Sequence, residues 1–189
     1  STTSEILLSV HSIDIRFATN SPELLDSVEG LLRHFLSKIN SPCPMRMQFD
    51  GVDDRRDIPV QVSSEALLLY SGSGLPIGPN RQTTWLCDMY SDQGLLIADF
   101  HDEGLVVIDG ASYTAQGYLV RPESMAPDIR VSFVHFAMTE LLKRRGLYTF
   151  HATALEHNGK GVLIPGFSGR GKTTSFLSLL RSGYRYLSD

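Results

Sequence analysis

The chain has 189 residues, of which 42% are hydrophobic and 20% are charged, a composition typical of a folded protein. Its 17 basic and 21 acidic side chains leave a formal net charge of −4, which argues against a general nucleic-acid coat protein or a polybasic membrane binder. Two cysteines are too few for a secreted disulfide framework, and no apolar run approaches the roughly 18 residues of a membrane span, so we expect a cytoplasmic protein with reduced thiols.

The first elements are predicted from hydrophobic spacing. Ile13, Ile15 and Phe17 alternate with polar residues, which predicts a strand with one buried face. Ser21 and Pro22 then offer a helix N-cap and a proline at the first helical position. Apolar residues at helical spacing continue as far as Leu36, so we expect the first helix to extend that far.

Residues 45–120 favour short strands joined by turns. The candidate strands lie at residues 45–49, 67–70, 84–89, 95–100, 105–108 and 112–119. Asp109-Gly110 predicts a type I′ hairpin turn between the last two strands. Residues 71–81 contain a Gly-x-Gly that we interpret as part of a surface loop, since no strand and helix flank it as in a nucleotide site.

A second helix is predicted from Asp128, as its cap, to Arg145, with Gly146 as the terminating residue. Apolar residues surround most of this helix, which predicts that it is largely buried. We place a domain boundary between Arg121 and Pro127. This gives an N-terminal α+β domain at residues 1–124 and the beginning of a second domain at residues 125–189.

Residues 166–174 read GFSGRGKTT and match the Walker A phosphate loop, G-x-x-x-x-G-K-[ST]. Glycines at this spacing let backbone N–H groups wrap a polyphosphate, and the following helix adds the positive end of its dipole. Lys172 is expected to reach the β- and γ-phosphates of ATP, and the Thr173 hydroxyl to bind Mg²⁺. The expected nucleotide contacts are Gly166, Ser168, Gly169, Arg170, Gly171, Lys172, Thr173 and Thr174.

Two further residues are placed near this loop by the strands around it. An Asn158-Gly159 turn between strands at residues 147–155 and 161–165 predicts an antiparallel hairpin that sets His151 opposite Gly166. Asp189 ends an alternating stretch after the loop helix, where a metal-binding or proton-accepting carboxylate belongs. The alternatives are a strand histidine bonded to a neighbouring carbonyl and a solvated surface aspartate.

Residues 151–189 resemble the catalytic core of HPr kinase/phosphorylase and its relatives, which share a P-loop fold with phosphoenolpyruvate carboxykinase. The resemblance is carried by His151, the Gly159-x-Gly161 pair, the phosphate loop, Gly183 and Asp189. It implies an incomplete P-loop kinase domain that continues beyond Asp189, in which Asp189 is the base or metal-linked acid and His151 assists at the phosphates. The loop departs from the usual HPr kinase pattern at Phe167 and at Thr173-Thr174.

These observations predict a kinase that uses ATP and Mg²⁺ to phosphorylate a hydroxyl of a protein or peptide, with Lys172, Asp189 and His151 as catalytic residues. We expect neither nucleic acid nor membrane as a partner, and self-association stays open. One alternative is a carboxykinase-like enzyme that acts on a small acid. Another is a non-catalytic module in which a bound nucleotide stabilises a conformation that a partner recognises.

Overall fold

The computed structural model describes residues 2–38, 43–73, 86–150, 152–165 and 172–188, which divide into two compact units at Leu147 and Tyr148. Within these residues there are three α-helices, a large mixed sheet and a small antiparallel sheet, so the chain combines helices and sheets as predicted. The first unit contains β1 (Ser4–Val10), β2 (Ile13–Thr19), α1 (Pro22–Leu32), β3 (Leu36–Ser37), β4 (Met45–Val52), β5 (Leu67–Ser73), β6 (Leu86–Asp92), β7 (Leu95–Asp99), β8 (Gly104–Asp109), β9 (Thr114–Val120) and α2 (Pro127–Lys143). Short 3₁₀ turns lie at Arg33–Phe35, Arg55–Asp57, His101–Glu103 and Pro122–Ser124.

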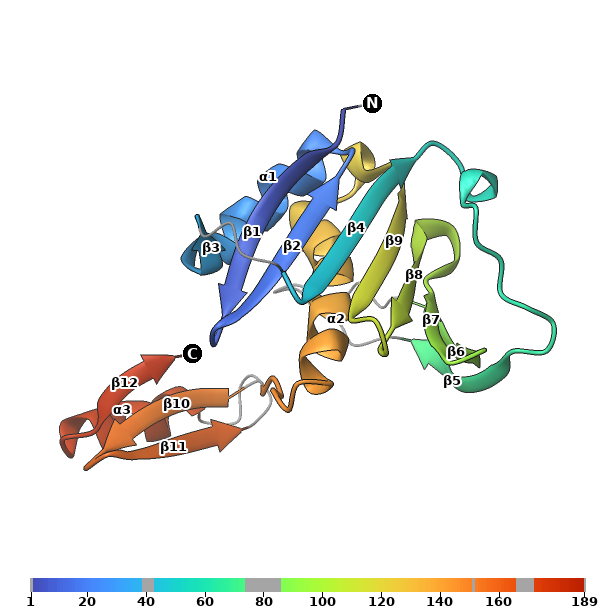
Figure 1. The fold of residues 1–189 in the computed structure, drawn as a ribbon. Coiled ribbons are helices and arrows are strands. Elements are labelled where there is room, and N and C mark those ends of the chain that lie inside the picture. Colours follow the sequence, from blue (N-terminus) through green and yellow to red (C-terminus); the bar gives the residue numbers. More distant parts are fainter. Residues whose placement is uncertain (1, 39–42, 74–85, 151, 166–171, 189) are drawn as a thin grey trace. The chain divides into compact units, whose positions relative to one another are not determined.

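The large sheet has the strand order β3-β1-β2-β4-β9-β8-β7-β6-β5. β4 lies parallel to both β2 and β9, and the other neighbouring strands are antiparallel. Helices α1 and α2 cover one face of this sheet (Figure 1). The strand β1 has no counterpart among the elements predicted from the sequence.

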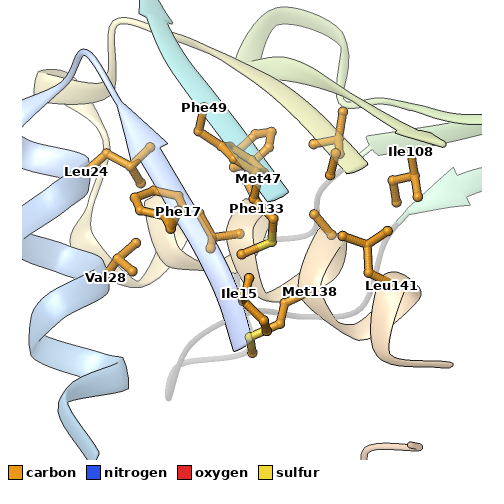
Figure 2. Packing of buried hydrophobic residues seen from close by; sticks show 14 of the residues in the cluster. Ile15, Phe17, Leu24, Val28, Met47, Phe49, Ile108, Phe133, Met138 and Leu141 are labelled. Atoms are coloured by element: carbon orange, nitrogen blue, oxygen red, sulfur yellow. The ribbon is translucent and has the colours of Figure 1, made fainter. Parts of the chain in front are cut away.

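The main core lies between that face and the two helices. Figure 2 shows Leu24 and Val28 of α1 and Phe133 of α2 directed toward Phe17 and Phe49 of the sheet, and all five side chains are fully buried. The opposite face is covered at β7, β8 and β9 by the segment between β4 and β5. That segment supplies Ile58 to a second cluster of buried apolar side chains.

The first helix starts as predicted and ends earlier. The Ser21 hydroxyl accepts a hydrogen bond from the Leu24 N–H, and Pro22 is the first helical residue. The helix stops at Leu32, although apolar spacing extends to Leu36. Leu36 pairs with Leu8 at the sheet edge instead, so β-pairing with β1 replaces the last helical turn.

The turn after Asp109 also differs from the predicted type I′ turn. Asp109 pairs with Thr114, which leaves a loop of residues 110–113, and the positive φ falls on Tyr113 rather than Gly110. The Asp109 carboxylate accepts hydrogen bonds from the N–H groups of Ala111 and Ser112. These bonds favour the longer loop, since they satisfy turn N–H groups that a two-residue hairpin would not contain.

Helix α2 is buried as predicted, but it belongs to the first unit. Its N-cap is Ala126, with Asp128 inside the first turn, and Gly146 has the left-handed φ expected of a terminating glycine. Phe133, Val134 and Leu141 are fully buried in the main core. This packing moves the structural boundary from the predicted residues 124/125 to Leu147 and Tyr148, because α2 completes the core of the large sheet.

The second unit contains β10 (Ala152–His157), β11 (Lys160–Pro165), α3 (Lys172–Arg181) and β12 (Arg185–Ser188). The predicted strand at residues 147–155 begins only at Ala152. Leu147 packs against the first unit's core, and its N–H donates to the Leu142 carbonyl at the end of α2. The small sheet has the order β11-β10-β12, with β10 antiparallel to both neighbours.

Candidate phosphate-loop site

The candidate site is built at one end of the small sheet. Because β10 is antiparallel to β11 and β12, its first residue lies at the same end as the last residues of the other two strands. Ala152 pairs with Pro165, and Ser188 pairs with Ala154. The first residue of β10 and the last residues of β11 and β12 therefore lie at one end of the small sheet.

The hairpin of β10 and β11 forms as predicted. Asn158 and Gly159 have φ values of 52° and 77°, the left-handed conformation that a type I′ turn requires at both central residues. His157 pairs with Lys160, and the pairing continues without a shift to Ala152 and Pro165. The next residues in this register are His151 and Gly166, which lie outside the described residues.

Helix α3 follows the loop sequence. Its Phe176 ring packs edge-on against Tyr186 of β12, with 5.6 Å between ring centroids. Leu155 of β10, the central strand of the small sheet, is fully buried. The helix thus packs on the small sheet. The helix itself was predicted from the apolar residues after the Walker sequence.

The structure describes the predicted site residues only in part. Lys172, Thr173 and Thr174 form the first turn of α3, and the Thr174 side chain is exposed. Outside the described residues lie Gly166, Ser168, Gly169, Arg170, Gly171, His151 and Asp189. The contacts predicted for these residues, and the Mg²⁺ ligands Thr173 and Asp189, remain predictions.

The electrostatics of α3 favour an anion at its N-terminus. The first turn contains no acidic residue, and Arg181 lies in the last turn, where a positive charge complements the helix dipole. The first N–H groups of a helix have no partner within the helix and are available to phosphate oxygens. This end of α3 follows directly on the loop that the sequence assigns to phosphate binding.

Glu156 links the hairpin turn to β12 at the end of the small sheet opposite the candidate site, and no pattern in the sequence indicated this residue. Its carboxylate accepts hydrogen bonds from the Gly159 N–H and from Arg185 Nε of β12, each at 2.5 Å. The hydrogen bond from Arg185 is the main cause that holds the pKa of Glu156 below its ordinary value, and the Gly159 N–H adds to the effect. Glu156 and Arg185 are 29 residues apart, so only the strand pairing, and no local spacing, could have indicated the pair.

No known protein family, curated protein or solved structure matches the chain. In the parts of the chain that the structure describes, no helix is both long and apolar enough to cross a membrane. The candidate site therefore depends on the chain's own sequence and geometry.

Proposed function

We propose that the protein is a P-loop kinase of the HPr kinase type, which transfers the γ-phosphoryl group of ATP to a hydroxyl of a protein or peptide. One observation carries this proposal: the Walker A sequence begins directly after β11, and its Lys172 and Thr173 are the first residues of α3. A strand that leads in and a helix that leads out are the context in which this sequence pattern binds phosphate. The antiparallel approach to the loop supports the HPr kinase type, since ordinary Walker folds reach the loop from a parallel sheet.

The proposed roles follow from the chemistry of each residue. Lys172 and the loop N–H groups would stabilise the charge on the β- and γ-phosphates. Thr173 and Asp189 would hold Mg²⁺, which when bound neutralises charge on the phosphates. Asp189 could alternatively accept the proton of the attacking hydroxyl, and His151 would assist at the phosphates.

Turnover by the full chain tests this proposal. ATP hydrolysis and transfer to a mixture of candidate peptides should be measured on the wild type, Asp189→Asn and Lys172→Ala. General-base assistance is typically worth 10²–10⁴-fold, so Asp189→Asn should slow turnover by roughly that factor while ATP affinity stays nearly unchanged. Lys172→Ala should lose both affinity and rate.

The same measurements separate the proposal from the non-catalytic, nucleotide-gated module. Wild-type turnover by Asp189→Asn would contradict the role of that carboxylate. ATP binding without any turnover would instead favour the nucleotide-gated module. Phosphopeptide mapping in cells that carry intact protein or Lys172→Ala would identify the acceptor of an active kinase.

A further inference from the structure

The face of the large sheet opposite the helices is polar and hollow at β2, β4 and β9. In each of these strands the residues that alternate with the core point to this face. A hollow of about 630 Å³ lies over them and is lined in part by Arg16, Arg46, Gln48, Thr114 and Gln116. Figure 1 shows these strands with both helices on the far side, so neither helix of the first unit covers the hollow.

Strand register explains why a hollow forms at this place. Arg16, Arg46 and Thr114 are direct neighbours across three parallel strands. The next row on the same face is Ala18, Gln48 and Gln116. Ala18 has the smallest side chain of the two rows. The longer side chains around it project further from the sheet, and a hollow remains above Ala18.

The charges in the hollow do not balance. Arg16 pairs with Glu5 at 2.8 Å, and both side chains remain partly exposed. The Arg46 side chain is exposed, and its guanidinium has no hydrogen bond or ion pair with any described residue. Two guanidinium groups on adjacent strands repel each other, and Glu5 offsets only one of them. The hollow therefore carries a surplus positive charge in a chain whose formal net charge is −4.

Uncharged polar groups accompany the unpaired guanidinium. Gln116 is exposed, and its side-chain amide has no hydrogen-bond partner among the described residues. Gln48 donates to Asp50, which lies further along β4 and does not line the hollow, and its amide oxygen remains an acceptor. Amide side chains both donate and accept, as a peptide backbone does.

We propose that this face binds an extended acidic segment of a polypeptide, whose carboxylate pairs with Arg46 and whose backbone bonds to Gln48 and Gln116. A second hollow of about 450 Å³, lined by residues of β1 and β3, shares Glu5 and Arg16 with the first, and we treat the two hollows together as one groove. A long, open groove suits an extended chain, whereas small-molecule sites bury most of their ligand. The inference does not rest on the proposed kinase activity.

Fluorescence anisotropy with the full chain tests the inference. The probe is a fluorescein-labelled peptide of alternating Glu and Ala, and the matched peptide has Gln in place of Glu. The protein should bind the Glu peptide at least about tenfold more tightly, with an affinity that falls as salt rises. Equal binding of the two peptides, or no binding of either, would overturn the inference.

Substitutions of three exposed residues test whether the peptide binds in this hollow. Arg46→Ala should weaken binding of the Glu peptide about tenfold, while Arg56→Ala should leave it unchanged, since Arg56 is an exposed arginine that does not line the hollow. Glu5→Gln should tighten binding about threefold, because it removes the carboxylate that competes for Arg16. A purely structural role would not produce opposite changes in Arg46→Ala and Glu5→Gln. Unchanged affinity in both variants would contradict the proposal.

Discussion

Gly117 of β9 lies directly beside Phe49 of β4, and the Phe49 ring occupies the space that a side chain at Gly117 would need. A Cβ added at Gly117 would lie 2.2 Å from the nearest ring carbons. Phe49 is fully buried and also packs against Phe17, with 5.9 Å between ring centroids. Because Gly117 has no side chain, the Phe49 ring can pack directly against the backbone of β9.

Gly117→Ala should therefore destabilise the first unit by about 1–3 kcal/mol, the usual cost of overpacking a core. Gly30→Ala is the matched control, because Gly30 lies in α1 with open space where its Cβ would be. That substitution should stabilise the helix by about 0.5–1 kcal/mol. Urea unfolding of both variants measures the changes, and equal stability of Gly117→Ala and wild type would contradict the packing.

Arg130 should be the most sensitive charged residue of the first unit. Its buried guanidinium donates to the carbonyls of Pro122 and Met125 and to the Ser27 hydroxyl of α1. Arg130→Ala leaves both carbonyls without this donor and should cost about 3 kcal/mol. Ser27→Ala removes only one of the three bonds and should cost about 1 kcal/mol. Thermal unfolding that ranks these variants in the reverse order would be inconsistent with the observed bonds.

The Glu156 carboxylate should titrate below the ordinary range of glutamate. Because its pKa is lowered in the folded chain, the bonds to Arg185 and Gly159 stabilise the hairpin above the ordinary glutamate pKa. That stability is lost as the pH falls through the lowered value. Carbon-detected NMR titration of Glu156 measures the shift, and Arg185→Ala should move the pKa back toward its ordinary value. An unchanged pKa in Arg185→Ala would show that the ion pair is not its cause.

Cys87 should be inert toward thiol reagents in the folded protein. Its side chain is buried, and this burial, with the charges of Asp88 and Asp99, raises its pKa to about 11. Little thiolate is therefore present at neutral pH, and little of the sulfur is accessible. Alkylation by iodoacetamide, followed by mass spectrometry, should modify Cys87 only after urea is added. Rapid modification in native buffer would contradict this burial.

Local signals predicted the parts of the fold in which one segment determines its own structure. Ser21 and Pro22 mark the start of α1, and Asn158 with Gly159 forms the predicted hairpin turn. These signals depend on capping and on left-handed φ values, which act within a few residues. The Walker sequence likewise predicts a strand and a helix on its two sides, and β11 and α3 confirm them.

Contacts between distant segments account for what the sequence did not predict. Leu36 fits a helical stripe, but its pairing with Leu8 places it in a strand. The apolar residues of α2 indicate burial but not the surface that buries them, so the sequence predicts a boundary before the helix, whereas the structure has it after the helix. The sequence alone does not indicate a binding role for Arg46, because only the register of β2, β4 and β9 places it near Arg16 and Gln116.

The affinity of the full chain for Mg·ATP tests whether residues 166–174 bind a nucleotide. Isothermal titration calorimetry should compare the wild type with Lys172→Ala and with Lys160→Ala, which removes an exposed lysine from β11. We expect Lys172→Ala to weaken binding by at least about 1.5 kcal/mol, the loss of a charge-assisted contact, and Lys160→Ala to bind as the wild type does. Equal affinity of Lys172→Ala and wild type, or no binding by the wild type, would contradict the assignment of residues 166–174 as a nucleotide-binding loop.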